Sequence, residues 1–207
     1  TDLWVLEVTT AERKKLVDNP GSDSSARWSP NGQWLAYLSN RGTHSGVTQT
    51  RLYAIPAAGG TPHLLTNGFE LDAGNPIWSK DGKTVYFGSN VRQDTAIFAC
   101  EFGSGSTRQL TRGMGAISMS DSGVTGDIIV GIVRRPQKPG EVYRADAAFQ
   151  SVQTITDQNE WLKDYALGEV EILKWKSKDG TDIEGVLTKP VGFDPGRRYP
   201  LLLNPHG

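Results

Sequence analysis

The sequence predicts a mostly β fold, an incomplete β-propeller followed by the first strands of an α/β domain, on three observations. A strand-and-turn motif occurs as "WSPNGQWLAYLSN" from Trp28 and again, 50 residues later, as "WSKDGKTVYFGSN" from Trp78. A second element, rich in β-branched and aromatic residues, follows each copy. After Thr156 the repeat ends, and a different hairpin and a leucine-rich segment follow. Repeats of 40 to 50 residues are typical of propeller blades.

The first motif predicts a tight hairpin turn. Its turns are expected at Asn31-Gly32, at Asp81-Gly82 and, in a weaker copy that begins at Met119 in place of tryptophan, at Ser122-Gly123. Glycine adopts positive φ without a Cβ clash, and Asn or Asp tolerates the neighbouring turn position.

The strand after the first turn is apolar on both faces. Trp34, Ala36 and Leu38 point to one side, whereas Leu35 and Tyr37 point to the other. Such a strand is expected to be covered on both sides, as it is between neighbouring blades.

The second element begins at Leu52, Ile97 and Val142, and the opening "LWVLEVTTAERKKLV" from Leu3 has the same pattern. Four short strands per unit then predict three blades and the outer half of an earlier one, so that the chain begins part-way through a repeat. The expected blades are Arg27 to Thr66, Asn75 to Thr111 and Gly115 to Thr156. Closed propellers have four to eight blades, and residues 1–157 are therefore expected to be a partial propeller.

A β-sandwich is the competing architecture, but it would show apolar and polar alternation without this period. Within the propeller, four tryptophans are assigned to packing between blades rather than to stacking on a ligand. They are Trp4, Trp28, Trp34 and Trp78.

Residues 158–207 predict a linker and the truncated start of a second domain. "WLKDYALGE" from Trp161 reads as a short helical connector, and two alternating strands flank Asp179-Gly180 as a hairpin. The hairpin ends where prolines and glycines begin, at Pro190. The continuous apolar run Leu201 to Leu203 predicts a strand buried on both faces, as in a parallel sheet.

Charge and cysteine content exclude several classes of function. The 207 residues include 22 basic and 23 acidic ones without a basic run, which argues against nucleic acid and membrane as partners. No apolar stretch is long enough to span a bilayer, and "TDLWVLEV" carries no export signal pattern. The compartment, cytoplasmic or periplasmic and secreted, is left open. The single Cys100 is expected to be a buried hydrophobe.

Taken in order, the blades, the hairpin "EILKWKSKDGTDIEGVLTKP" and the final "YPLLLNPHG" resemble the prolyl oligopeptidase family of serine peptidases, especially its acylaminoacyl-peptidase and dipeptidyl-peptidase branch. The blade motif alone is equally similar to the propeller of TolB-like periplasmic proteins. The resemblance implies that residues 158–207 begin an α/β-hydrolase catalytic domain.

The resemblance also implies where the chemistry lies. In that family the last motif continues as His-Gly-Gly-Pro and forms the oxyanion region, which places His206 and Gly207 there. The amide donor would belong to the next residue, and His206 itself could equally be a packed structural residue. The chain contains no Gly-x-Ser-x-Gly elbow, since "GSGSTRQ" from Gly103 lacks the second glycine. The triad is therefore expected beyond Gly207, and the chain by itself is expected to be inactive.

The implied activity is hydrolysis of short peptides through a Ser-His-Asp acyl-enzyme, without a metal or organic cofactor. The propeller would restrict access to small or unfolded peptides. Two rival hypotheses stay open, a non-catalytic TolB-like scaffold and an α/β-hydrolase esterase. Oligomeric state and cleavage specificity are not predicted.

Six loop residues complete the candidates. The arginines could bind a peptide carboxylate or be solvated loop charges, and the histidines are expected to be exposed. They are Arg41, Arg92, Arg134, Arg135, His44 and His63.

Overall fold

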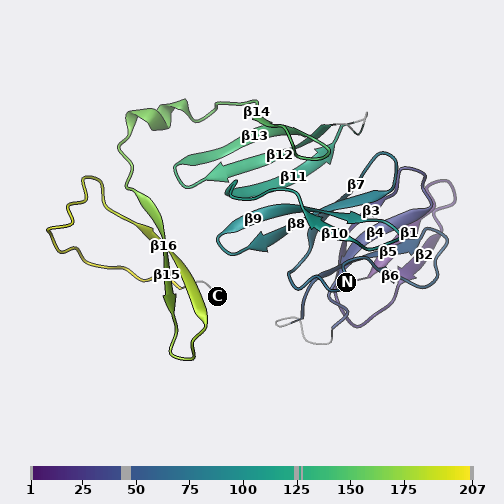
Figure 1. The fold of residues 1–207 in the computed structure, drawn as a ribbon. Helices are drawn as coiled ribbons and strands as arrows, with labels where there is room; N and C mark the ends of the chain where they lie inside the picture. The colour runs from purple at the N-terminus through teal and green to yellow at the C-terminus, as the bar shows by residue number, and fades with distance from the viewer. Residues whose placement is uncertain (1, 43–47, 124–125, 127, 206–207) are drawn as a thin grey trace. The chain divides into compact units, whose positions relative to one another are not determined.

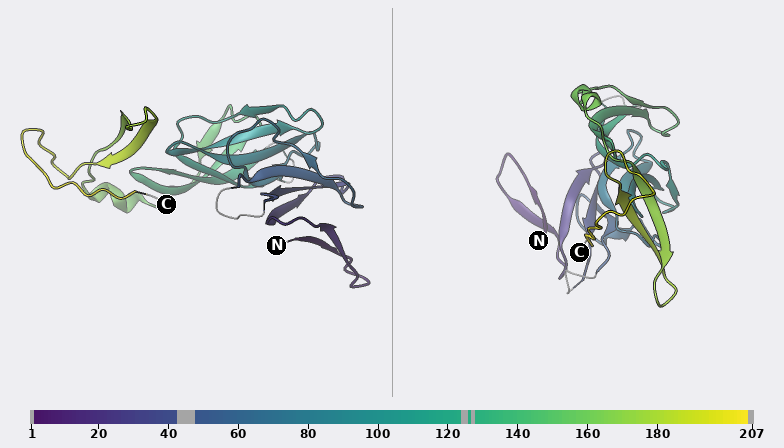
Figure 2. Two further views of the ribbon diagram at one scale, coloured as in Figure 1. Left: turned by 90° about the horizontal axis from the view of Figure 1, so that it is seen from below. Right: turned by 90° about the vertical axis from the view of Figure 1, so that its left-hand side faces the viewer.

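The computed structural model describes residues 2–42, 48–123, 126 and 128–205, and the chain divides into two compact units, Thr1–Gln158 and Asn159–Gly207. Each unit is treated by itself. The first is built only of β-strands among its described residues (Figures 1 and 2). A two-stranded sheet of β1 (Leu3–Leu6) and β2 (Arg13–Val17) precedes three four-stranded sheets.

Each four-stranded sheet is an antiparallel meander in chain order, from an inner first strand to an outer fourth strand (Figure 1). The first sheet holds β3 (Asp23–Trp28), β4 (Trp34–Ser39), β5 (Arg51–Pro56) and β6 (His63–Leu64). The second holds β7 (Gly74–Trp78), β8 (Thr84–Val91), β9 (Asp94–Glu101) and β10 (Thr107–Gln109). The third holds β11 (Ala116–Ser122), β12 (Ile128–Arg135), β13 (Lys138–Asp146) and β14 (Val152–Thr154).

These sheets are the predicted blades. Three complete blades and the outer half of an earlier one are present, as expected, although the first blade begins at Asp23 rather than at Arg27. The sheets stack one after another instead of forming two facing layers, so the competing β-sandwich is wrong. Among the described residues the blades do not close into a ring.

The hydrophobic core lies between the blades, in three separate clusters. Ala36 and Leu38 of β4 belong to the cluster shared with the second blade, against which Trp34 also packs. Leu35 and Tyr37 belong to the cluster shared with the sheet of β1 and β2. The two-sided apolar strand is therefore confirmed: β4 contributes to two cores because it has a neighbour on each face.

Cross-strand aromatic pairs occupy one equivalent position in the first and second blades. Tyr37 stacks on Tyr53 with ring centroids 5.7 Å apart, and Phe87 stacks on Phe98 at 5.5 Å. In the third blade Gly131 stands opposite Tyr143, and a Cβ added at Gly131 would lie 2.9 Å from that ring and 1.9 Å from the Ser118 carbonyl oxygen. Tyr143 thus covers the glycine, as aromatic residues do in other sheets.

A threonine ends each of the three complete blades and makes the same hydrogen bond to the backbone. The hydroxyl oxygens of Thr66, Thr111 and Thr156 accept hydrogen bonds from the amides of the residues at the second-element positions, Leu52, Ile97 and Val142, at 3.1, 2.9 and 2.9 Å. The repeated "T" of the second element is therefore a structural hydrogen-bond acceptor, which satisfies an amide where strand pairing stops.

The predicted turns are confirmed in the first two blades. Ser29 donates its hydroxyl to Asn31 Oδ1 at 2.7 Å and accepts the Trp34 amide at 2.9 Å, while Gly32 has φ 69°. Ser79 and Asp81 repeat this arrangement.

The turn prediction for the third blade is wrong. The Gly123 amide donates to the Ile128 carbonyl and the Gly126 amide to the Gly123 carbonyl, so Gly123 holds the position of Ser29. The glycine with positive φ is Gly126, at 73°. Ser122 rather than Met119 then corresponds to Trp28. The predicted turn glycine, Gly123, precedes the observed one, Gly126, by three residues.

The packing assignment holds for two of the four tryptophans. Trp78 is buried, and its indole N–H donates to the Arg27 carbonyl of the previous blade at 3.0 Å. Trp34 packs in the same interblade cluster. By contrast Trp4 is 56% exposed and Trp28 52% exposed, so the assignment is wrong for these two among the described residues.

The second unit holds a short 3₁₀ helix, η1 (Glu160–Asp164), and one hairpin of β15 (Val170–Lys176) and β16 (Asp182–Thr188). Both elements were predicted. The hairpin turns at Asp179-Gly180, where Gly180 has φ 86°. Ser177 donates to Asp179 Oδ1, and the Asp179 carboxylate accepts the Thr181 amide at 3.0 Å, as in the blades.

The prediction of a buried strand at Leu201 to Leu203 is not met. These side chains are 75 to 94% exposed, and no strand is assigned to them. The apolar run needs partners on both edges and both faces to be buried, and no described strand pairs with it.

Candidate functional site

The site residues predicted from the sequence, His206 and Gly207, lie outside the described residues. What the structure does describe is the segment that leads to them. After β16 the chain makes a compact loop, in which the Asp194 amide donates to the Tyr199 hydroxyl at 3.0 Å and the Phe193 and Tyr199 rings lie 5.2 Å apart. These contacts order the loop immediately before the leucine-rich segment.

A charged clamp fixes the start of that loop. Lys189 contacts the carboxylates of Glu171 at 2.8 Å and Glu169 at 3.2 Å, and its amide donates to the Glu169 carbonyl. Hydrogen bonding to Glu171, and then to Glu169, raises the pKa of Lys189. Its ammonium also lies 5.3 Å from the Phe193 ring. The clamp ties both ends of the hairpin to the loop.

In the first unit, one end of the blades collects the candidate arginines. The second and third strands of each blade are joined at this end, which we call the exit end because the chain leaves the propeller there after β14. Arg41 follows β4, Arg92 lies in the turn between β8 and β9, and Arg134 and Arg135 end β12. The topology thus brings to one end four residues that are widely separated in sequence.

Two of these arginines have unusual backbone geometry. Arg41 and Arg92 have φ values of 42° and 58°, a region that non-glycine residues rarely adopt. The Arg41 guanidinium carbon lies 5.2 Å from the Tyr53 ring, so part of its side chain rests on an aromatic surface. Arg134 and Arg135 are exposed. The exit end therefore carries four arginines, and the Arg41 side chain is held against the Tyr53 ring.

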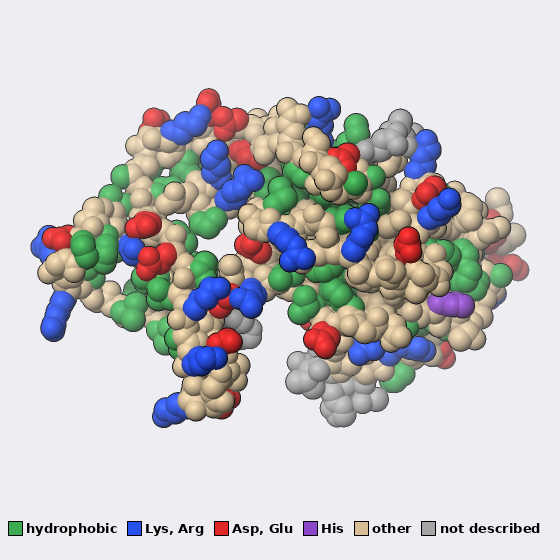
Figure 3. Space-filling model, in the orientation of Figure 1, with side chains coloured by type: hydrophobic (Ala, Val, Ile, Leu, Met, Phe, Trp, Pro, Cys, Tyr) green, Lys and Arg blue, Asp and Glu red, His purple; other side chains and the backbone are tan. Residues whose placement is uncertain are grey.

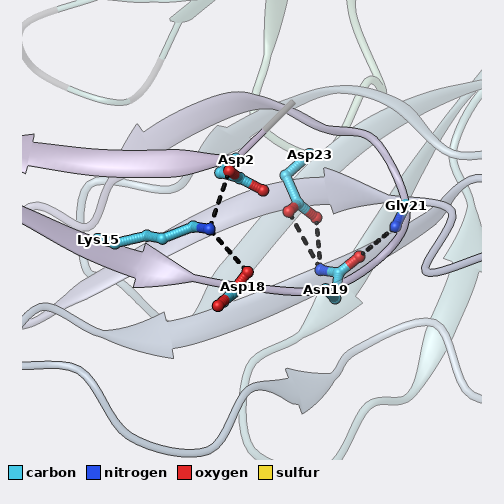
Figure 4. A network of polar contacts seen from close by, with 6 residues as sticks. All are labelled: Asp2, Lys15, Asp18, Asn19, Gly21 and Asp23. Carbon is cyan, nitrogen blue, oxygen red and sulfur yellow. Dashed lines mark hydrogen bonds and ion pairs between the residues drawn. The ribbon is translucent and has the colours of Figure 1, made fainter.

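Two sets of polar contacts lie at the exit end, one within the half-blade and one between the connecting loop and the start of β3 (Figure 4). The Asn19 amide donates to both carboxylate oxygens of the buried Asp23, at 3.0 and 3.1 Å. Lys15 contacts Asp18 at 2.7 Å and Asp2 at 3.0 Å, and hydrogen bonding to Asp18 first, then to Asp2, raises its pKa.

A buried phenol packs beside these contacts. Burial, followed by the nearby charge of Asp23, raises the pKa of Tyr37 well above its usual range. Tyr37 is therefore a neutral phenol. Sequence reasoning did not identify Asp23, because a single carboxylate at a strand start follows no period.

Glu141 is the second buried acid that sequence reasoning missed. Glu141 is the first buried residue of β13. Its carboxylate accepts hydrogen bonds from the Gln158 amide, at 3.1 Å, and from the Thr156 hydroxyl. The chain is therefore anchored at the exit end immediately before it enters the second unit. The only sequence feature that points to Glu141 is its partner Thr156, the third copy of the blade-terminal threonine.

The remaining candidates carry no catalytic arrangement. His63 is an exposed residue of β6 whose ring contacts Trp34 at 5.3 Å, whereas His44 lies outside the described residues. Cys100 is buried as expected, and burial raises the pKa of its thiol. Among the described residues no group of three His, Cys, Asp or Glu side chains could hold a metal ion.

Charges of both signs are mixed on the face drawn in Figure 3, where Lys and Arg side chains lie among Asp and Glu side chains. Within the described residues no helix is long and apolar enough to cross a membrane.

The family described as "TolB beta propeller domain" matches residues 1–162, which include every described blade. This chain belongs to that family. Dipeptidyl-peptidase 5 of Porphyromonas gingivalis is 22% identical over 205 residues, which cover 98% of this chain and 30% of that protein. The chain thus spans less than a third of this relative's length. The relatives named as dipeptidyl peptidases bear out the resemblance to prolyl oligopeptidase-family peptidases.

Solved structures show the same fold at low sequence identity. Pyrococcus horikoshii acylaminoacyl peptidase superposes with a TM-score of 0.67 at 17% identity, covering 91% of this chain and 28% of that one. TolB from Acinetobacter baumannii superposes with a TM-score of 0.63 at 18% identity, covering 93% of this chain and 44% of that one. The propeller fold is therefore shared with a peptidase and with TolB.

Proposed function

We propose that this chain is the propeller and domain-entry part of a serine peptidase that releases aminoacyl, acylaminoacyl or dipeptidyl units from short peptides. The observation that carries the proposal is the order of elements: blades, an anchored exit at Glu141, the β15–β16 hairpin and the segment leading to His206. A relative named dipeptidyl-peptidase 5 aligns across 98% of this order, including the part beyond the blades.

In this proposal the hydrolase residues supply the chemistry. A serine attacks the peptide carbonyl carbon, histidine takes the serine proton and returns it to the leaving amine, and water then hydrolyses the acyl-enzyme. The backbone beside His206 and Gly207 approaches the carbonyl oxygen so that an amide there donates to the developing oxyanion. Glycine suits this position because it leaves room for close approach. None of these steps requires a metal or organic cofactor.

The exit end supports a substrate-binding role for the blades. Arg41, Arg92, Arg134 and Arg135 belong to the end from which the chain leaves for the second unit. A guanidinium binds a carboxylate through two parallel hydrogen bonds, so these cations would suit the carboxylate of a peptide substrate. The blades would then act both as a size filter and as an anchor for one peptide terminus.

The complete parent protein tests this proposal. It should hydrolyse chromogenic amides of aminoacyl, acylaminoacyl or dipeptidyl groups, and a fluorophosphonate should label one serine and abolish turnover. The 207-residue chain should show neither labelling nor turnover. Gly207→Ala should lower kcat by about 100-fold with little change in KM. Gly196→Ala, in the preceding loop, is the matched control and should leave kcat unchanged.

Two results would replace the proposal. Turnover of simple esters without any amide would make the parent an esterase. Absence of both labelling and turnover would favour a non-catalytic scaffold, the second candidate, which is supported by the match of residues 1–162 to TolB propellers.

A further inference from the structure

The end of the blades opposite the exit end contains a cavity of about 270 Å³ that belongs to none of the sites above. Its walls come from the last residues of three inner strands, β3, β7 and β11, and from the turns that follow them. The structural alignment of the turns makes Arg27, Ile77 and Asp121 equivalent, and Trp28, Trp78 and Ser122 equivalent. Two adjacent repeat positions, each used three times, therefore build most of the cavity.

The three blades contribute different chemistry at these positions. Two indoles, Trp28 and Trp78, form an apolar wall, and Trp28 is the more exposed of the two. Arg27 and Lys80 each bring a positive charge, whereas Asp121 brings one negative charge. The described lining residues carry a net positive charge beside an aromatic surface, a combination that fits an apolar group carrying one anionic head.

Several contacts hold this lining in place. The Trp78 indole N–H donates to the Arg27 carbonyl at 3.0 Å, which joins the two blades at the cavity. Lys80 runs along Gly126, where an added Cβ would lie 2.1 Å from the Lys80 Cβ and 3.1 Å from its Cγ. Asp121 Oδ1 accepts the Ser122 amide at 2.8 Å. These contacts fix the Trp78 indole and the Asp121 carboxylate before a ligand binds, and a wall that is already ordered loses less entropy on binding.

We propose that this cavity binds the C-terminal residue of a short peptide, with the carboxylate between Arg27 and Lys80 and the apolar side chain against Trp28. A single main-chain carboxylate matches the two cations, and an aliphatic side chain covers the exposed indole. Asp121 disfavours a second negative charge, so acidic C-terminal residues bind less well. This binding does not depend on peptidase activity.

Calorimetric titration of the fluorophosphonate-treated parent protein tests the proposal without peptide cleavage. N-acetyl-leucyl-leucine should bind at least about tenfold more tightly than its C-terminal amide, because only the acid carries the charge that both cations recognise. Arg27→Ala, Lys80→Ala and Trp28→Ala should each weaken binding of the acid by about fivefold or more. Asp121→Asn should strengthen it by a few-fold because it removes a repulsive charge.

Lys83→Ala is the matched control, since Lys83 is an exposed cation of the same turn that does not line the cavity. It should leave binding unchanged. Equal affinity for acid and amide, or equal effects of Lys80→Ala and Lys83→Ala, would overturn the proposal. Circular dichroism of each variant distinguishes lost binding from lost folding. Because the nucleophile is blocked throughout, a parent without peptidase activity would still give either outcome.

Discussion

The second blade and the β15–β16 hairpin use similar turns in opposite surroundings. In Ser79-Lys80-Asp81-Gly82 and Ser177-Lys178-Asp179-Gly180 the serine hydroxyl donates to the aspartate and the glycine amide donates to the serine carbonyl. The serine amide then donates to the Thr84 carbonyl in the blade but to the Thr181 carbonyl in the hairpin, whose turn is one residue shorter. Yet β8 and β9 are mostly buried, whereas no residue of β15 or β16 is fully buried. The comparison separates what a turn sequence can specify, which is a hairpin and its register, from what needs neighbouring sheets, which is a core. An isolated two-stranded hairpin is only marginally stable.

Removing one apolar side chain from each region gives the largest contrast. Phe87 is fully buried and stacks on Phe98, whereas Val186 of β16 is 59% exposed. Phe87→Ala should lower the free energy of unfolding of the blades by about 3 to 5 kcal/mol through the cavity it leaves. Val186→Ala should change it by less than about 0.5 kcal/mol. Urea unfolding followed by circular dichroism measures both, and equal effects would contradict the assignment of the core to the blades.

Adding one methyl group tests the same contrast from the other direction. A Cβ at Gly131 meets the Ser118 carbonyl oxygen at 1.9 Å, and backbone cannot yield without breaking the β11–β12 pairing. A Cβ at Gly185 meets only the exposed Trp175 ring, at 2.9 Å, which can rotate away. Gly131→Ala should therefore cost about 1 to 3 kcal/mol.

Gly185→Ala is the matched control, and it should leave the thermal midpoint of the blades unchanged. If Gly131→Ala and the unmodified chain had the same thermal midpoint within experimental error, the third blade would be able to rearrange around the added methyl group, against the expectation. Differential scanning calorimetry resolves the two results, since overpacking lowers the midpoint by several degrees in a domain of this size.

Much of the fold follows from the sequence because its signals are short-range. The Ser-x-Asn/Asp-Gly turn acts within a few residues of itself, and the terminal threonine acts on an amide 14 residues earlier in the same blade, so three blades could be predicted with nearly correct bounds. The third turn was misplaced because Ser122-Gly123 looks like a turn step, whereas the residue with positive φ is Gly126. Which of the two glycines adopts positive φ depends on the strand register, and the sheet as a whole sets that register.

The candidate sites were less predictable for a different reason. The burial of Leu201 to Leu203 depends on partners far from it, and local apolarity does not supply them. Asp23 and Glu141 act through contacts 4 and 15 to 17 residues away and occur once each. The cavity beside Trp28 requires three equivalent positions to converge, which a repeat implies only after the blades have been correctly aligned.

The smallest expected effect concerns the acid stability of the two turns. Hydrogen bonds from Ser79 and the Lys83 amide lower the pKa of Asp81 below its ordinary value of 3.8, and those from Ser177 and the Thr181 amide lower that of Asp179 to about 2. A lowered pKa in the folded state adds stability above the unfolded pKa, and this stability is lost as the pH falls through the folded pKa. The Asp179 turn should therefore weaken between about pH 4 and about pH 2, and the Asp81 turn should weaken as the pH falls below about 4.

Asparagine separates the charge from the hydrogen bonds, because Asn31 already makes the same turn in the first blade with its amide oxygen. Asp81→Asn should keep the turn and reduce the acid-induced loss of blade stability, measured as urea midpoints from about pH 5 to about pH 2. Asp179→Asn should leave those midpoints unaltered, because its hairpin lies outside the blades. If Asp81→Asn had no influence on the acid slope while Asp179→Asn flattened it, the two turns would not belong to separately stabilised regions, and the contrast between blade and hairpin would fail.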